Sequence, residues 1–419
     1  MIVASIDLQG GQAVQLVGGQ KLAIAAGDPM PIAERFSRVG EIAVIDLDAA
    51  LGTGNNAALV EAICQRYPCR VGGGIRDLET ARYWLNAGAR KIILGTAATP
   101  ELLSQLPKDR VIAALDAVQG EVVTHGWQTR TGESIDQRMA ALLPYVQGFL
   151  ITFVEREGRL GGTDVERMAP LVRAAGRTRI TFAGGFTTAA EIALADQLGA
   201  DAQVGMALYS GRLDLADAFA APLRTDRDDG LWATVVTDTD GHALGMCWSS
   251  AESLRVAVQE GRGVYWSRSR NALWRKGETS GAWQKLVRVD ADCDRDALRF
   301  VVEQQAPGFC HENTWTCWGN VHGLSALAQT MQQRRQQPEP GSYTQRLLAE
   351  PMLLAAKLRE EVEELIEAST PEHVTQEAAD VLYFTLARMT AAGVSLADVA
   401  RVLDQRALRV TRRPGNAKQ

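Results

Sequence analysis

The chain has 419 residues, a formal net charge of −6, 46% hydrophobic and 22% charged residues, an ordinary composition for a protein with two or three folded domains. The mild negative charge and the lack of a basic run argue against a nucleic-acid partner, and no apolar run reaches the roughly 18 residues that a membrane span requires. Because the opening segment, MIVASIDLQGG, already has the pattern of a strand and a turn, we expect no targeting peptide and a cytoplasmic protein.

In residues 1–223, short β-branched runs alternate with helical stretches. The pattern predicts a (β/α)8 TIM barrel. Its expected strands are Ile2–Ile6, Ala43–Leu47, Arg70–Gly72, Lys91–Leu94, Val111–Leu115, Gly148–Thr152, Arg179–Phe182 and Ala202–Val204. The segments GGIRDLETARYWLNAGARKIILGTA and GGFTTAAEIALADQLGADAQVGMA, which begin at Gly73 and Gly184, resemble each other, so the barrel is expected to consist of two duplicated halves.

Glycines follow two successive strands in each half, where backbone amides can cradle a phosphate. Two such places favour a substrate with a phosphate at both ends, although glycine also permits tight turns there. The candidate residues are Gly74, Gly95 and Thr96 in the first half, and Gly185 and Gly205 in the second.

Two aspartates, Asp7 and Asp116, end the first and fifth expected strands. In a barrel both would point into the mouth at the carboxyl ends of the strands, although a single aspartate at a strand end is more often a helix cap. An acid and a base that face each other across a substrate can move protons in both directions.

The motifs SIDLQGGQAVQL, VIDLDAA, VGGGIR, ALDAVQGEVVTHGW and FAGGF resemble the isomerase of histidine biosynthesis that converts the aminoaldose ProFAR into the aminoketose PRFAR, over the whole barrel. The resemblance implies that Asp7 is the base, Asp116 the acid and Thr152 a substrate-positioning hydroxyl. It also implies that Trp127 stacks on the imidazole of the substrate; otherwise Trp127 would be a core residue at the barrel rim.

Three residues depart from the isomerase pattern. Phe153 stands where an aspartate often follows the threonine, Glu157 replaces an aspartate, and Met206 replaces an arginine beside the second phosphate loop. Two of these departures, Phe153 and Met206, leave open an alternative in which the barrel also accepts phosphoribosylanthranilate, the analogous aminoaldose of tryptophan biosynthesis.

Residues 224–319 contain the segment DADCDRDALRFVVEQQAPGFCHENTWTC, which begins at Asp290. Its three thiols are one ligand short of a closed zinc site, so a water could complete the tetrahedron, although three cysteines can also be ordinary buried thiols. Its aspartates alternate, and in an extended strand they would share one face and offer hard oxygens to Mg²⁺. The thiols are Cys293, Cys310 and Cys317, and the aspartates are Asp292, Asp294 and Asp296.

This segment and the preceding YWSRSRNALWRKGETSG resemble phosphoribosyl-AMP cyclohydrolase. The resemblance implies a small α+β domain in which the three cysteines bind Zn²⁺ and the three aspartates bind Mg²⁺. It further implies a zinc site assembled in a homodimer. His311 is a candidate proton shuttle, for which a structural histidine is the alternative. The implied substrate-binding residues are Arg268, Lys276, Glu278 and Ser280.

Residues 323–419 have the pattern of an all-α domain, interrupted by the loop sequence QQPEPGSYTQ. Glu361 and Glu364 share one helix face, as do Glu377 and Asp380, and two acidic pairs on successive helices can hold Mg²⁺ against a polyphosphate. Such faces are usually only solvated. The segments GSYTQRLL, KLREEVEELIEA and EAADVLYF resemble phosphoribosyl-ATP pyrophosphohydrolase, which implies that these four acids bind Mg²⁺ and act in catalysis.

The three families catalyse consecutive steps of histidine biosynthesis. We therefore expect one multifunctional enzyme that converts phosphoribosyl-ATP into PRFAR with Zn²⁺ and Mg²⁺ and that forms a homodimer through its cyclohydrolase and helical domains. In the alternative, one domain survives only as a dimerisation module.

Overall fold

The computed structural model describes residues 1–124, 126–127 and 129–411. The chain divides into two compact units. One comprises Met1–Val236, Met246–Gln304 and the described residues from Gln405 onward, and the other comprises Thr237–Gly245 and Gln305–Asp404. Among the described helices, none is both long and apolar enough to cross a membrane.

The first unit contains the expected TIM barrel. Its parallel strands occur in the order β10-β11-β12-β1-β4-β5-β6-β7, and β10 pairs with β7 to close the barrel. The bounds are β1 Ile2–Gln9, β4 Ile42–Asp46, β5 Cys69–Gly72, β6 Lys91–Leu94, β7 Val111–Val118, β10 Gly148–Phe153, β11 Arg179–Ala183 and β12 Asp201–Val204. Every barrel strand expected from the sequence is confirmed.

Two barrel strands, β1 and β7, run three residues further than expected. β1 continues past Asp7 and pairs antiparallel with β2 (Gln12–Val17), while β7 continues past Asp116 and pairs with β8 (Glu121–Thr124). The expectation that the aspartates end their strands was therefore wrong, because each strand continues beyond its aspartate as the first strand of a β-hairpin. The same device after the first and fifth barrel strands matches the expected duplication. Each hairpin adds a further strand, β3 (Lys21–Gly27) and β9 (Thr129–Ser134).

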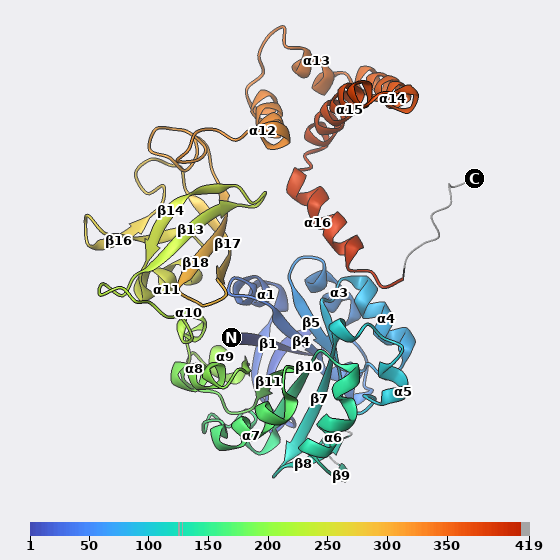
Figure 1. The fold of residues 1–419 in the computed structure, drawn as a ribbon, viewed down its shortest axis with the longest axis vertical. Coiled ribbons are helices and arrows are strands. Elements are labelled where there is room, and N and C mark those ends of the chain that lie inside the picture. Colours follow the sequence, from blue (N-terminus) through green and yellow to red (C-terminus); the bar gives the residue numbers. More distant parts are fainter. Residues whose placement is uncertain (125, 128, 412–419) are drawn as a thin grey trace. The chain divides into compact units, whose positions relative to one another are not determined.

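Helices follow the barrel strands and surround them (Figure 1). The two helices of the repeat, α4 and α8, are capped at equivalent N-terminal positions. Asp77 accepts a hydrogen bond from Thr80 N at 2.7 Å, and Thr188 forms a capping box with Glu191. The bounds are α1 Pro29–Ser37, α2 Leu47–Leu51, α3 Ala57–Cys64, α4 Leu78–Ala87, α5 Pro100–Leu103, α6 Ile135–Leu142, α7 Val165–Ala175, α8 Ala189–Gln197, α9 Met206–Tyr209 and α10 Leu215–Ala220.

The middle region is built on a sheet of order β14-β13-β18-β17 with a separate β15-β16 hairpin. Strand β17 pairs antiparallel with β18 up to Ala291 and Leu298, so residues 292–296 form the turn between them. The expectation that the alternating aspartates lie in an extended strand was wrong. The bounds are β13 Trp232–Asp238, β14 Ala243–Ser249, α11 Ala251–Glu260, β15 Val264–Ser267, β16 Ala272–Arg275, β17 Gln284–Ala291 and β18 Ala297–Gln304.

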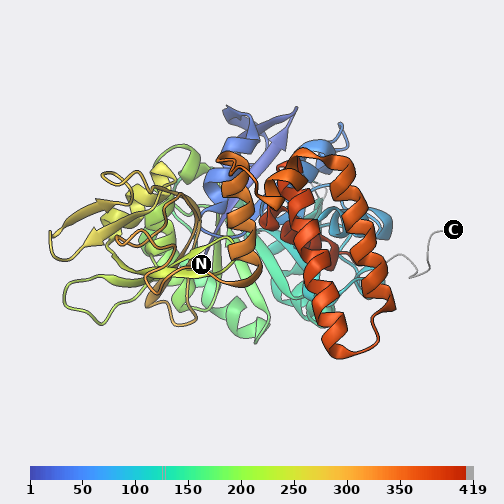
Figure 2. The ribbon, with the colours of Figure 1, turned by 90° about the horizontal axis from the view of Figure 1, so that it is seen from above.

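The C-terminal region is helical, as expected. Helices α14 and α15 pack side by side (Figure 2), and their contact is filled by apolar residues that include Leu354, Phe384 and Leu386. The expected loop separates α12 from α13. The bounds are α12 Gly323–Gln336, α13 Tyr343–Ala349, α14 Pro351–Glu367, α15 Pro371–Ala392 and α16 Leu396–Ala407.

Candidate functional site

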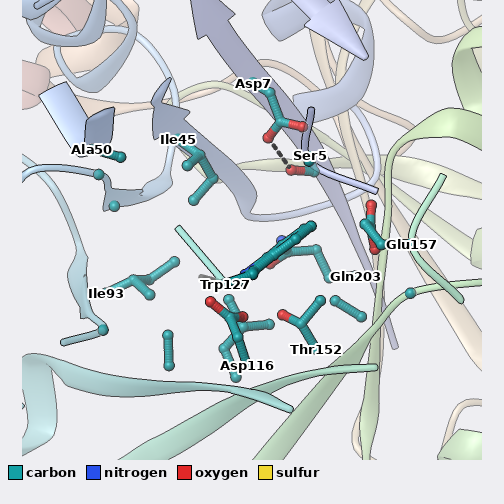
Figure 3. A pocket seen from close by; sticks show the side chains of 18 of the residues that line it. Ser5, Asp7, Ile45, Ala50, Ile93, Asp116, Trp127, Thr152, Glu157 and Gln203 are labelled. Atoms are coloured by element: carbon teal, nitrogen blue, oxygen red, sulfur yellow. Dashed lines mark hydrogen bonds between the residues drawn. The ribbon is translucent and has the colours of Figure 1, made fainter. Parts of the chain in front are cut away.

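A cavity of about 530 Å³ opens at the carboxyl ends of the barrel strands. This is the face where TIM-barrel enzymes have their active sites. All nine barrel residues selected from the sequence line it: Asp7, Gly74, Gly95, Thr96, Asp116, Trp127, Thr152, Gly185 and Gly205. Figure 3 shows Asp7 on one side of this cavity and Asp116 beside Thr152 on the other.

Asp7 is a partly buried carboxyl group that lines the cavity. Ser5 Oγ donates a hydrogen bond to Asp7 Oδ1 at 3.1 Å (Figure 3), and Gln15 Nε2 lies 3.5 Å from Oδ2. Burial raises the pKa of Asp7 to about 6, against the opposing effect of the Ser5 hydrogen bond. A carboxylate with this pKa is basic enough to accept a proton from carbon at neutral pH and remains mostly ionised there.

Asp116 lies level with Thr152 across the pairing of β7 with β10. Burial raises the pKa of Asp116, whereas hydrogen bonds from Thr152 and Trp127 favour its ionised form and oppose this rise. Thr152 is therefore hydrogen-bonded to Asp116. The Trp127 indole reaches into the mouth of the cavity between the two aspartates (Figure 3).

Glu157 is a third acid in this cavity, and it was not among the catalytic residues expected from the sequence. It follows β10 in the loop VEREG and lines the cavity. Burial raises its pKa to about 8, and the charges of Asp7 and Asp116 contribute to the rise. Glu157 therefore carries a proton at neutral pH. The available signal was its place: an acid just beyond the carboxyl end of a barrel strand.

The paired glycines at the two proposed phosphate loops are required by the backbone. Gly73 and Gly184 both have φ +95°, and a Cβ there would lie 2.1 Å from Asp46 O and 2.6 Å from Phe153 O. The same backbone conformation at these two matching positions supports the duplication. At Gly95, in contrast, a Cβ would meet nothing within 4 Å among the described residues, so the turn does not demand glycine and open space remains for a ligand.

The cavity is also lined by two arginines that the sequence did not single out, Arg76 and Arg138. They are held by backbone carbonyl groups: Arg76 Nη2 donates to Ala50 O at 2.8 Å, and Arg138 Nη2 donates to Ala98 O at 2.9 Å. These guanidinium groups bring positive charge to the half of the cavity that contains the first phosphate loop. Met206, which replaces an arginine at the second loop, also lines the cavity, whereas Phe153 is buried against Phe182 with ring centroids 5.7 Å apart.

In the middle region, the carboxylate oxygens of Asp292, Asp294 and Asp296 lie within 4.8 Å of one another in the β17–β18 turn. The turn is closed by Asp292 Oδ1, which accepts hydrogen bonds from Asp296 N at 3.1 Å and Ala297 N at 3.2 Å. The charge of Asp294 is the main cause of the raised pKa of Asp296. Three hard oxygens that repel one another at short range suit a divalent cation such as Mg²⁺.

The proposed zinc ligands occur in both units. Cys310 and Cys317 belong to the second unit, and Cys293 belongs to the first. Hydrogen bonds from the Glu312 backbone, Thr314 and Cys317 lower the pKa of the Cys310 thiol, so this sulfur is readily available as a thiolate ligand. His311 Nδ1 lies 3.8 Å from Cys310 Sγ, which places the expected proton shuttle beside one expected zinc ligand.

The expected cyclohydrolase substrate residues follow the strands of one hairpin. Arg268 comes directly after β15, and its guanidinium carbon lies 4.5 Å from the centroid of the Trp248 ring. Lys276 comes directly after β16, and its backbone amide donates to Gly263 O at 2.9 Å. Glu278 and Ser280 lie in the turn beyond, where the Ser280 hydroxyl accepts from Ala282 N at 3.4 Å.

The four acids of the helical region come together between α14 and α15. Oxygens of Glu361, Glu377 and Asp380 lie within 4.8 Å of one another, and Glu364 hydrogen-bonds to Glu377. Within the described part of the chain, the buried Glu377 Oε2 has no hydrogen-bond partner. A buried carboxylate oxygen without a partner fits a site that is completed by a cation.

Lys357 adds a cation to this cluster that the sequence did not single out. Its Nζ lies 2.8 Å from Glu360 Oε1 and 3.3 Å from Glu361 Oε1. The available signal was the spacing of four residues between Lys357 and Glu361 on one helix.

Comparisons with known proteins agree on all three regions. Residues 1–214 match the family described as histidine biosynthesis protein, residues 245–319 match phosphoribosyl-AMP cyclohydrolase, and residues 324–407 match phosphoribosyl-ATP pyrophosphohydrolase. These matches follow the division of the chain into a barrel, a β-rich region and a helical region.

Individual relatives carry related names. A histidine biosynthesis trifunctional protein of Saccharomyces bayanus is 50% identical over 199 residues, which cover 47% of this chain and 25% of that protein. A trifunctional protein of Neurospora crassa is 38% identical over 341 residues, covering 80% of this chain and 36% of that protein. The bifunctional protein HisIE of Gloeobacter violaceus is 38% identical over 196 residues, covering 44% of this chain and 89% of that protein. The chain spans 25 to 49% of the length of the first fungal relatives that it matches.

Proposed function

Because the chain belongs to the histidine biosynthesis protein family, we propose that it catalyses three consecutive reactions of that pathway. Phosphoribosyl-ATP loses pyrophosphate in residues 323–419, the adenine ring of phosphoribosyl-AMP is opened in residues 224–319, and ProFAR is isomerised to PRFAR in residues 1–223. The observation that supports the proposal is that the expected acids lie near one another: Asp7 and Asp116 line one cavity, and oxygens within each of the two other acidic clusters lie within 4.8 Å of one another. We further propose that the protein is cytoplasmic and homodimeric.

In the barrel, a phosphate at each end of ProFAR would bind one of the two glycine loops, so that the ribose lies between Asp7 and Asp116. One acid protonates the ribose ring oxygen, the C1′–O bond breaks, and the resulting open-chain imine is deprotonated at C2′ by Asp7. The enaminol that forms then tautomerises to the ketose. Asp116 keeps the role of acid, and Glu157 is added as a second proton donor because its pKa of about 8 keeps it protonated at neutral pH.

In the helical region, Glu361, Glu364, Glu377 and Asp380 would hold Mg²⁺, which neutralises the charge of the departing pyrophosphate. The close approach of their oxygens and the unpartnered Glu377 Oε2 support this assignment. The side chain of Lys357, which contacts Glu360 and Glu361, would turn from its carboxylate partners toward a phosphate oxygen.

In the middle region, Cys293, Cys310 and Cys317 would hold Zn²⁺, which lowers the pKa of a bound water so that it can attack the adenine ring. Asp292, Asp294 and Asp296 would hold Mg²⁺. His311 would take the proton from the attacking water, since its ring lies beside Cys310. Arg268, Lys276, Glu278 and Ser280 would bind and orient the nucleotide from the hairpin side.

A coupled assay that starts from phosphoribosyl-ATP and resolves each intermediate tests the proposal. Pyrophosphate, phosphoribosyl-AMP, ProFAR and PRFAR should appear in that order. Phosphoribosylanthranilate supplied in parallel tests the alternative of a wider barrel specificity. Of the two departures that left this alternative open, only Met206 is among the cavity-lining residues described, because Phe153 packs into the core. A pathway that stops at one intermediate would instead favour a domain that is only a dimerisation module.

A further inference from the structure

Arg295 lies in the middle of the proposed magnesium turn, between Asp294 and Asp296, but its side chain is paired elsewhere. Its backbone has φ +69°, a left-handed conformation that is uncommon outside glycine and asparagine. Its guanidinium forms a salt bridge with Asp196, which belongs to barrel helix α8. The turn therefore extends its only positive charge toward the barrel instead of toward its own aspartates.

Asp196 is a buried carboxylate that is built into a charge network. Its side chain is 4% exposed, and its Oδ1 accepts a hydrogen bond from the amino group of Met1 at 3.0 Å. The same amino group contacts Asp201, which also pairs with Arg179 at 2.7 Å. A buried carboxylate fixed in this way holds a cationic partner firmly, because losing that partner would leave it under-compensated.

The backbone of Arg295 is held as well. Its carbonyl oxygen accepts a hydrogen bond from Arg224 N at 2.8 Å, and Arg224 lies in the segment that follows the barrel. Both the backbone carbonyl and the guanidinium of Arg295 are thus held by residues outside the turn.

The position of this guanidinium matters for a cation in the turn. Asp292, Asp294 and Asp296 are exposed and lie close together, so a free arginine between them in sequence would pair with them and compete with a metal ion. With Arg295 withdrawn, the mutual repulsion of the three carboxylates is left for a divalent cation to relieve.

We propose that Asp196 of the barrel is a positioning residue for the magnesium turn of the cyclohydrolase region: it withdraws Arg295 from the aspartates and so maintains the turn's affinity for a divalent cation. The inference rests on the proposed function of the turn as a Mg²⁺ site. It also gives the fused barrel a role in the reaction of its neighbour.

The test measures Mn²⁺ binding to the zinc-loaded full chain by electron paramagnetic resonance. All variants carry Glu377→Gln and Asp380→Asn, so that the helical acids do not contribute. Adding Asp196→Asn should weaken Mn²⁺ binding about 5-fold, the scale of one exposed ion pair. Adding Arg295→Gln to Asp196→Asn removes the competitor and should return the affinity to within about 2-fold of the parent, as expected for a loss of competition rather than of folding.

The matched control is Asp217→Asn, which removes a different ion pair, that of Asp217 on α10 with Arg255 on α11 at 2.7 Å. This variant should leave Mn²⁺ binding unchanged. Unchanged binding in Asp196→Asn, or weak binding that Arg295→Gln does not rescue, would overturn the inference. If the parent itself binds no Mn²⁺, or binds it equally well with Asp292→Asn, the metal assignment of the turn fails instead. The two failures are therefore distinguishable.

Discussion

The ionisation states of Asp7 and Glu157 set opposite requirements for the barrel reaction. As base, Asp7 must be ionised, so activity should fall as the pH drops through its pKa of about 6. As proton donor, Glu157 must be protonated, so activity should fall as the pH rises through its pKa of about 8. We predict a bell-shaped profile of kcat/KM for ProFAR between these limits. Because the two carboxyl groups interact, the two apparent pKa values of the profile belong to the Asp7–Glu157 pair rather than to either residue alone.

Glu157→Gln tests the donor role. The amide keeps the size of the side chain but has no acidic proton, so kcat should fall on the order of 10²-fold and the alkaline limb should disappear. The acid limb should stay in place, because Glu157 is already protonated and neutral at the pH where Asp7 titrates. The matched control is Glu155→Gln, two residues earlier in the same loop, whose carboxylate pairs with Arg167 at 2.8 Å. An unchanged alkaline limb in Glu157→Gln would leave Asp116 as the sole acid.

Asp7→Asn and Asp116→Asn should each lower isomerisation on the order of 10²-fold or more, with a smaller effect on KM, because both substitutions remove proton transfer while they keep the shape of the site. Initial rates with purified ProFAR measure this effect. A normal kcat for either variant would contradict its role.

At the scale of single residues, the sequence predicted most of the barrel site but not its protonation. The glycines were selected because they follow expected strands in a repeated pattern, and Asp7 and Asp116 were selected from their expected positions at strand ends together with the resemblance to the isomerase. Glu157 was noticed only as a replacement, since its raised pKa depends on burial and on two aspartates that are far away in the chain. Neither the burial of a side chain nor its distance from residues far away in the chain can be read from sequence spacing.

At the scale of elements, the helix pair α14–α15 makes a sharp prediction. Glu364→Gln should slow pyrophosphate release on the order of 10²-fold, because a neutral amide holds Mg²⁺ much more weakly than a carboxylate does. Ring opening of supplied phosphoribosyl-AMP should persist. Glu363→Gln, an exposed neighbour on the same helix, is the matched control and should release pyrophosphate normally. Equal rates in the two variants would mean that the acids form only a solvated face.

The two acidic clusters show where element prediction succeeded and where it failed. Glu361 and Glu364 share a helix face by a fixed periodicity, so their neighbourhood followed from the sequence once the helix was assigned. The aspartates of residues 292–296 were assigned to a strand by the same kind of reasoning, but they lie in a turn. Pairing between β17 and β18 decided this, and the pairing depends on residues on both sides of the segment.

At the scale of the whole molecule, the fold class and the order of regions could be predicted because each region has its own motifs. The division of the chain into units could not. The segment Thr237–Gly245 groups with Gln305–Asp404, although it includes the adjoining ends of β13 and β14, which belong to the middle sheet. Such a grouping reflects how segments pack, and local sequence patterns do not encode it.

One reagent should separate the three reactions in the intact chain. Two of the proposed sites depend on bound metal, whereas the barrel reaction uses carboxyl groups and backbone amides. Removal of metal with a strong chelator should therefore abolish pyrophosphate release and ring opening and leave isomerisation of supplied ProFAR within about 2-fold of normal. Re-addition of Mg²⁺ alone should restore the first reaction, and ring opening should also need Zn²⁺.

The barrel contacts the middle region within one compact unit, so loss of metal could also act through folding. Asp217→Asn, which removes a salt bridge between α10 and α11, provides a comparison for a loosened contact between them. Thermal unfolding followed by circular dichroism, with and without chelator, shows whether the barrel transition is retained. If isomerisation is lost while that transition is intact, the barrel mechanism is metal-dependent and the roles of Asp7 and Asp116 must be reassigned. If both are retained, the three chemistries are separable in one chain, because each site draws its reactive groups from its own elements.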